Sequence, residues 1–264
     1  MNQSKNPKVS IVIVNFNNAK YLRKSLDTAL SQTYKNKEVI VIDDMSNDNS
    51  SEILKKYKPK IKFYVNKTKT NFGSYNQINS YLKGIDKSKG KYIFFLDSDD
   101  YFKKNKVKLV VKKFTEQTNI KTLFDIPIIK TNKNLIKQKF VQKKFYFSSW
   151  PRFTPQSCIA IERSYANEIF KIIKIKKYPS IWFDFRIAIS NFLTFGEIII
   201  LNKHLTYYRQ LDNSASTNYK TFSKNWWYRR KEAHKFFSYI SKKLKIKDRI
   251  TLDKIITNIV NFFL

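Results

Sequence analysis

Short apolar runs alternate with helical patterns through the first 115 residues. Runs at 8–17, 37–42, 61–65 and 90–96 are rich in β-branched or aromatic residues, and each is typical of a strand. Between them, apolar residues recur every three or four positions, as at Leu22, Leu26, Ala29 and Leu30, which predicts helices. This order predicts parallel strands joined by right-handed crossovers, an α/β fold with a doubly wound sheet.

Carboxylates follow two of these strands directly. Asp43 and Asp44 end the second, and Asp97 and Asp99, an i, i+2 pair whose side chains share one side, end the fourth. Ligands of open α/β sheets bind beyond the carboxyl ends of the strands, so we expect these four acids around one crevice. Crowded like charges usually need a cation, and oxygen ligands favour Mg²⁺ or Mn²⁺. The alternative is a solvated acidic turn.

A glycine-rich phosphate loop is missing, because the chain has only four glycines. If a nucleoside diphosphate binds here, a metal held by carboxylates must neutralise it.

The first motifs, taken in order, resemble those of family 2 glycosyltransferases. The resemblance rests on VSIVIVNFNNAKYLRKSLDTALSQTYKNKEVIVIDDMSNDNS and the later GKYIFFLDSDD, strongly over 8–115 and loosely over 145–217. It implies the GT-A fold: a Rossmann-like, mostly parallel central sheet flanked by helices, with a helical C-terminal extension. The implied transferase domain is 1–217, with a nucleotide-sugar half (8–115) and an acceptor half (116–217), and the basic, aromatic extension is 218–264.

The same resemblance implies roles for single residues. Asp99 would bind the Mn²⁺ or Mg²⁺ ion, and the residues implied in binding the nucleotide-sugar are Phe16, Asn17, Asp44, Asp97 and Arg209. The basic residue that the family often carries within 71–84 is not evident here.

Asp184 matches the catalytic aspartate of the family, although Phe183 replaces the acid that usually precedes it. Its aromatic surroundings would raise its pKa toward a value useful for a general base. The alternative is an acid that only favours the helix dipole, worth about 0.3–1 kcal/mol. Trp150, Phe153 and Trp182 are the expected acceptor-side residues, and ordinary aromatic packing is the alternative for them.

The composition of the chain bears on its expected cellular compartment and on its partners. The 264 residues carry a formal net charge of +32 and one cysteine, and the start lacks the apolar core of a signal peptide. We therefore expect a cytoplasmic protein, with a peripheral position at the inner face of the membrane as an alternative. The lysines are scattered along the chain, which favours solvated faces for part of the excess, and attraction to anions such as acidic lipid head groups or phosphate-bearing substrates is the other interpretation.

The extension carries two amphipathic patterns, at 222–244 and 252–263. A helical hairpin packed on the domain, or across a homodimer, is one interpretation. Docking on an anionic membrane surface is the other, because Trp and Phe beside Lys and Arg suit an interfacial helix.

The sequence thus favours an inverting, metal-dependent glycosyltransferase. It would move a sugar from a nucleoside-diphosphate sugar, with UDP as the expected nucleotide, to a hydroxyl of a saccharide or glycolipid acceptor in bacterial surface polysaccharide or glycolipid assembly. An inactive transferase-like assembly protein is the first alternative. A nucleic-acid-binding protein would explain the charge but not the acidic turns, so nucleic acid is an unlikely partner.

Overall fold

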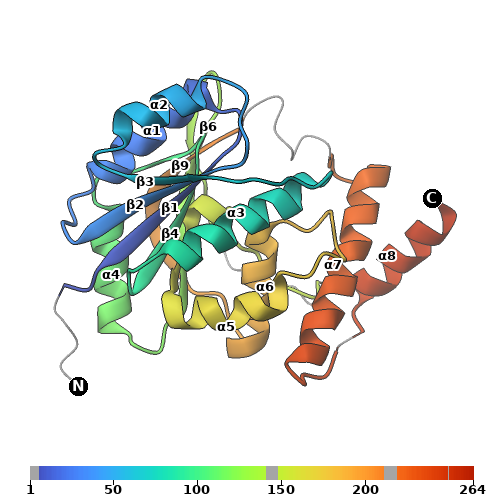
Figure 1. The fold of residues 1–264 in the computed structure, drawn as a ribbon. Helices are drawn as coiled ribbons and strands as arrows, with labels where there is room; N and C mark the ends of the chain where they lie inside the picture. The colour runs from blue at the N-terminus through green and yellow to red at the C-terminus, as the bar shows by residue number, and fades with distance from the viewer. Residues whose placement is uncertain (1–5, 141–147, 211–218, 249) are drawn as a thin grey trace.

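The computed structural model describes residues 6–140, 148–210, 219–248 and 250–264. Its first half is the predicted alternation of strands and helices, in which the four strands pair in parallel (Figure 1). The elements are β1 (Val9–Asn15), α1 (Ala19–Leu30), β2 (Lys37–Asp43), α2 (Ser50–Tyr57), β3 (Lys62–Val65), α3 (Gly73–Lys87) and β4 (Tyr92–Asp97).

The second half continues the same sheet with mixed strand directions. The sheet runs β3-β2-β1-β4-β8-β6-β9-β5, with β7 beside β6. β8 pairs antiparallel with β4 and β6, whereas β6 and β9 are parallel. The uninterrupted run of parallel strands therefore ends after β4, and parallel pairing returns between β6 and β9. The added elements are β5 (Tyr101–Phe102), α4 (Lys106–Glu116), β6 (Thr122–Lys130), β7 (Leu135–Lys137), η1 (Gln156–Cys158), β8 (Ile159–Glu162), α5 (Arg163–Ile173), α6 (Phe183–Phe195) and β9 (Ile200–Arg209).

Two long elements of this half depend on their partners in the sheet. The strand β9 continues from Ile200 to Arg209, and β6 lies between β8 and β9 inside the sheet. Cys158 is buried just before β8.

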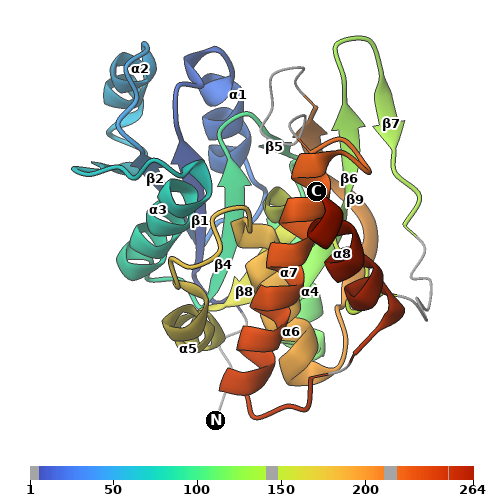
Figure 2. The same ribbon diagram turned by 90° about the vertical axis from the view of Figure 1, so that its right-hand side faces the viewer.

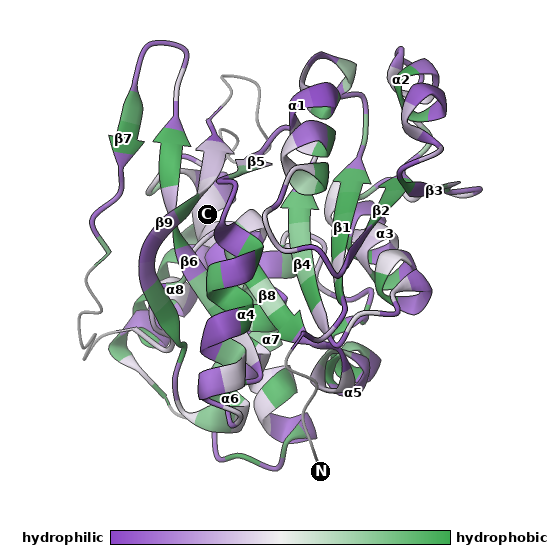
Figure 3. Cartoon of the chain, turned by 90° about the vertical axis from the view of Figure 1, so that its left-hand side faces the viewer, coloured by the Kyte–Doolittle hydropathy of each residue, from purple (hydrophilic) through white to green (hydrophobic). Residues whose placement is uncertain are grey.

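Two apolar layers cover the two faces of the sheet. Side chains of α1, α2 and α4 pack on one face, and those of α3, α5 and α6 on the other. Figure 3 shows the hydrophobic strands behind helices whose outer surfaces are hydrophilic. The helix α3 lies so close to β1 that a Cβ atom at Gly84 would fall only 2.2 Å from Val12 Cγ1. Only glycine fits at that crossing.

The C-terminal region forms a helical hairpin of α7 (Lys224–Lys243) and α8 (Leu252–Phe263), which lie side by side in Figure 2. Phe236, Phe237 and Ile240 of α7 belong to the same core as α3 and α6, so α7 packs on the domain. The apolar stripe of α8 does not: Ile255, Ile256 and Ile259 are 44–53% exposed. In the part of the chain that the structure describes, no helix combines the length and apolarity needed to cross a membrane.

A buried ion pair joins α4 to β6. Lys106 and Asp125 are both inaccessible to solvent, and the Lys106 Nζ lies 2.6 Å from Asp125 Oδ2. The same ammonium donates to Ser157 O and to Thr206 Oγ1, each at 2.6 Å. Scattered lysines favour solvated faces, but Lys106 is an exception, because a charged partner on β6 compensates its burial.

We expect Lys106→Met to lower the free energy of unfolding by about 3–5 kcal/mol, because it leaves the Asp125 carboxylate buried without its cation. Urea unfolding followed by circular dichroism measures the loss. The double variant Lys106→Met/Asp125→Leu should recover most of it, since neither charge then remains. Equal stability of the single variant and the parent chain would contradict this account.

Candidate active site

The register of the sheet brings the ends of three strands to one edge. Asn15 of β1 is paired with Asp43 of β2, and Val14 is paired with Asp97 of β4. The turns that follow these strands therefore emerge together and enclose a cavity of about 600 Å³. The predicted site residues that line it are Phe16, Asp44, Asp97, Asp99 and Trp182.

Asp43 does not line this cavity. Its carboxylate accepts hydrogen bonds from the Asn15 amide (2.7 Å) and from the Ser46 hydroxyl (2.7 Å) and backbone N–H (3.0 Å). The crevice therefore gathers three of the four expected acids, while Asp43 fixes the turn after β2.

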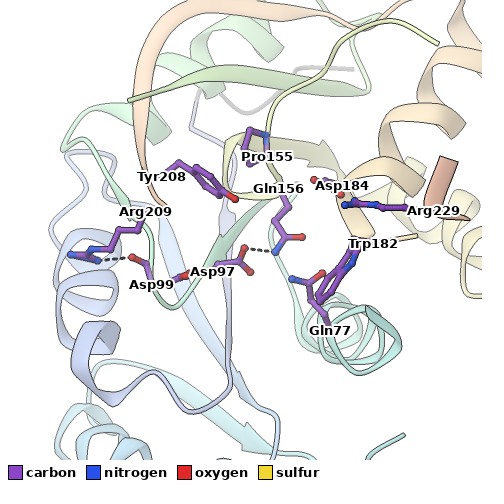
Figure 4. A pocket seen from close by; sticks show the side chains of 10 residues that line it. All are labelled: Gln77, Asp97, Asp99, Pro155, Gln156, Trp182, Asp184, Tyr208, Arg209 and Arg229. Atoms are coloured by element: carbon purple, nitrogen blue, oxygen red, sulfur yellow. Dashed lines mark hydrogen bonds between the residues drawn. The ribbon is translucent and has the colours of Figure 1, made fainter. Parts of the chain in front are cut away.

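A second cavity of about 190 Å³ adjoins the first and shares Gln77, Asp97, Asp99 and Trp182 with it. Figure 4 shows the remaining lining: Asp184 and Arg229 lie at one side, and Tyr208 and Arg209 at the other. The predicted base and the acidic cluster of β4 therefore belong to one site, although about 85 residues separate them in sequence.

Three carboxylates meet at the end of β4. Oxygens of Asp97, Asp99 and Asp100 lie within 4.8 Å of one another, which is a spacing that a single divalent cation can span. Asp97 accepts hydrogen bonds from the Tyr81 hydroxyl (2.9 Å) and from the Gln156 amide. Burial, followed by the charge of Asp99, raises the pKa of Asp97 to about 7.

Asp100 shows most directly that the residues present fit a cation. Its carboxylate is almost completely buried and accepts the backbone N–H of Arg209 at 2.8 Å. Its Oδ2 atom is buried without a hydrogen-bond donor among the described residues. Burial, together with the charges of Asp99 and Asp97, raises the pKa of Asp100 well above its usual value. A hard divalent cation would relieve both the missing partner and the repulsion.

Asp184 lies in the first turn of α6, where its carboxylate accepts the backbone N–H of Phe185 at 2.7 Å. Burial raises its pKa, and the charge of Arg229 opposes this shift. The loop before α6 is held by Arg186. Its guanidinium is fully buried and donates to four backbone carbonyls, those of Ile173, Ile175, Tyr178 and Ile181. These bonds fix the direction from which Asp184 enters the cavity.

Of the residues expected to bind the nucleotide, Phe16 and Asp44 line the larger cavity and Asn17 does not. Phe16 is 47% exposed at the cavity, and the Lys69 Nζ lies 3.5 Å from the centre of its ring. Asp44 accepts the amide of Asn66 at 2.8 Å. Asn17 lines neither cavity: it has a φ of 50°, and its side chain accepts the N–H of Asn47, so it shapes the turn.

The family model described as Glycosyl transferase family 2 matches residues 10–172, more than half of the chain. The chain belongs to glycosyl transferase family 2. An uncharacterized glycosyltransferase of Nostoc sp. is 28% identical over 217 residues, which cover 76% of this chain and 64% of the relative. TarP of Staphylococcus aureus, a poly(ribitol-phosphate) β-N-acetylglucosaminyltransferase, is 36% identical over 123 residues, or 40% of this chain and 36% of TarP. The chain thus spans less than two thirds of the length of these relatives.

Solved structures confirm the predicted fold of this family 2 chain. S. aureus TarS 1-349 in complex with UDP-GlcNAc has a TM-score of 0.65 at 17% sequence identity, over 96% of this chain and 70% of that one. TarS in complex with UDP has a TM-score of 0.61. At this identity the likeness shows a shared GT-A architecture.

Several lining residues of this family 2 site were not singled out from the sequence. Asp100 follows the predicted pair Asp97 and Asp99 in sequence, and its buried carboxylate lies in the same cluster. Two basic side chains that line the cavities come from outside the segment 71–84, namely Lys69 before α3 and Arg229 from α7. Gln156 follows an aromatic stretch without any motif. Trp150 and Phe153 line neither cavity but a separate groove beside α8.

The raised pKa of Asp97 predicts a pH-dependent stability in the absence of divalent metal. The folded chain holds the Asp97 proton more tightly than the unfolded chain, so this contribution is complete below about pH 4. It is lost as the pH rises through the folded pKa of about 7. Between pH 5 and pH 7.5 the free energy of unfolding should therefore fall more steeply for the parent chain than for Asp97→Asn. Urea unfolding with EDTA at both pH values checks this, and identical pH slopes would contradict it.

Proposed function

We propose that this chain transfers a sugar from a nucleoside-diphosphate sugar, UDP-linked, to an acceptor hydroxyl with inversion at the anomeric carbon. The observation that carries the proposal is the pair of adjoining cavities, which share Asp97 and Asp99. One offers an aromatic face and Asp44 for a nucleoside, and the other holds Asp184. The acidic cluster lies between them, where a diphosphate would sit.

The relatives support the donor and the setting. TarS was crystallised with UDP and UDP-GlcNAc, which favours a UDP-linked donor here. TarP is named for transfer of N-acetylglucosamine to poly(ribitol-phosphate), which favours a saccharide or polyol acceptor in cell-surface polymer assembly. The donor sugar itself follows from neither cavity.

The nucleoside would stack on Phe16, with the Lys69 ammonium beside it, and Asp44 would accept hydrogen bonds from the base or ribose. Arg209 and Arg229 line the smaller cavity from opposite sides, and both add positive charge toward a diphosphate. These two guanidinium groups would favour the leaving group as its negative charge grows.

Asp97, Asp99 and Asp100 would hold the divalent cation, Mn²⁺ or Mg²⁺. When bound, it would neutralise the diphosphate and the three carboxylates together. Without such neutralisation these carboxylates would repel the donor.

Asp184 is the proposed general base. Its carboxylate accepts the proton of the acceptor hydroxyl, and the hydroxyl oxygen attacks the anomeric carbon from the face opposite the diphosphate. The bond between that carbon and the diphosphate oxygen breaks, and its electron pair leaves with the nucleoside diphosphate. The buried position of Asp184 supports this role, because burial raises its pKa toward a value suited to accepting a proton.

We expect Asp184→Asn to reduce transfer by about 10²–10⁴-fold while leaving UDP affinity unchanged, because the amide cannot accept the proton. Transfer is measured with UDP-sugars and a saccharide acceptor, and affinity by the thermal shift with UDP and Mn²⁺. Asp86→Asn, an exposed aspartate on α3, is the matched control and should change neither. Unchanged turnover of Asp184→Asn would remove it from the mechanism.

Asp99→Ala should weaken Mn²⁺-dependent UDP binding by about tenfold or more, because the cluster loses ligand oxygens. Binding measured by calorimetry with Mn²⁺ and with EDTA separates the metal-dependent part. Equal affinities of the variant and the parent chain with Mn²⁺ would place the metal elsewhere. Failure of the parent chain to bind any nucleoside diphosphate would favour an inactive assembly protein.

A further inference from the structure

A large apolar groove lies outside the two cavities of the proposed active site. It is enclosed by the segment 148–153, the beginning of α7 and the first turns of α8, with a volume of about 710 Å³. The apolar side chains that line it include Trp150, Phe153, Phe222, Trp226, Trp227 and Ile256. A concave site of this size with aromatic walls is typical of a binding site for an apolar group.

The groove and the proposed active site share one wall, the segment 150–156. In the segment 150–156, Trp150 and Phe153 line the groove, whereas Gln156 lines the smaller active-site cavity. The Phe185 ring packs on Trp150 (5.1 Å between ring centres) and Phe153 (5.8 Å). Asp184, its neighbour in sequence, faces the active site. A molecule held in the groove therefore lies next to the proposed base.

Helix α7 contributes to both sides within one turn. Arg229 lines the active-site cavity, and the adjacent Arg230 lines the groove. Helix α7 thus contributes to both sites, whereas α8 contributes to the groove alone.

The charges of the groove favour an anionic partner group. Its ionisable lining residues are Arg152, Arg230 and Asp253. Arg230 is neutralised, because its Nη2 lies 2.6 Å from Asp253 Oδ2. Arg152 contacts the ring of Phe140 and has no acidic partner among the described residues. One uncompensated positive charge therefore remains at an apolar site.

We propose that this groove binds the hydrocarbon chain of an amphiphilic acceptor whose anionic head group, such as a phosphate, lies at Arg152. The accepting hydroxyl then extends along the segment 150–156 toward Asp184. This inference rests on the proposed function and names the class of its acceptor. A hydrocarbon chain fits the groove because the groove is concave, whereas a flat bilayer would touch the outward stripe of α8 and leave the groove unfilled.

Binding is tested with two soluble probes of equal chain length, decyl phosphate and decyl β-glucoside, both below their micelle concentrations. Three tryptophans line the groove, so their fluorescence reports its occupancy. We expect saturable binding of both probes, with decyl phosphate the tighter. Arg152→Gln should reduce the affinity for decyl phosphate to that of the glucoside and leave the glucoside unchanged. Absence of saturable binding by either probe would overturn the proposal.

A matched pair on α8 separates the groove from a membrane-binding face. Ile256 lines the groove and is 47% exposed, whereas Ile255 is 44% exposed and does not line it. We expect Ile256→Asn to weaken decyl phosphate binding by about tenfold, and Ile255→Asn to leave it unchanged. Thermal unfolding checks that both variants fold. Equal loss in both, with equal loss of binding to vesicles of phosphatidylglycerol and phosphatidylcholine, would overturn the proposal in favour of a bilayer surface.

The same variants keep this proposal distinct from the function on which it rests. Binding of UDP with Mn²⁺ depends on the strand ends, and Ile256→Asn should leave it unchanged. If the chain binds UDP but neither decyl probe, the groove proposal is wrong and the proposed transferase function stands. If the chain binds the probes but no nucleoside diphosphate, the proposed transferase function is wrong. The bound amphiphile could then not be its acceptor.

Discussion

Repulsion among three carboxylates at the end of β4 is the constraint around which the site is arranged. Asp97, Asp99 and Asp100 are held close together, with Asp97 and Asp99 half-buried and Asp100 buried, which disfavours their charged forms. The fold tolerates this because donors from distant parts of the chain converge there: Tyr81 of α3, Gln156 of η1 and Arg209 of β9. One oxygen of the cluster, Asp100 Oδ2, has no hydrogen-bond donor among the described residues.

The second half of the chain holds this cluster in place. The Lys106–Asp125 pair anchors α4 to β6, and the same ammonium bonds the carbonyl of Ser157. The hydroxyl of Ser157 in turn accepts the backbone N–H of Asp97 at 3.0 Å. A buried charge pair thus supports the acidic turn through one residue. The mixed strands contribute mainly by positioning these supports.

The C-terminal hairpin is more than an appendage to the transferase domain. Helix α7 shares the core of the α3 and α6 face, and Arg229 reaches the cavity that holds Asp184. The smaller cavity is therefore lined from the strand ends, from the start of α6 and from the hairpin, and one of its basic side chains, Arg229, lies beyond residue 217.

The sequence alone determined the parallel half of the fold and brought attention to Phe16, Asp44, Asp97 and Asp99, which line one cavity. Both depend on local patterns: strand and helix periodicity, and acids placed directly after buried strands. Tertiary structure decided what depends on distant partners. Lys106 is buried because it pairs with Asp125 on β6. Asp43 points away from the cavity because Asn15 and Ser46 donate hydrogen bonds to it. Trp150 lines a groove that the first turns of α8 help to form. Such outcomes depend on which segments meet in space, and periodicity along a chain carries no information about that.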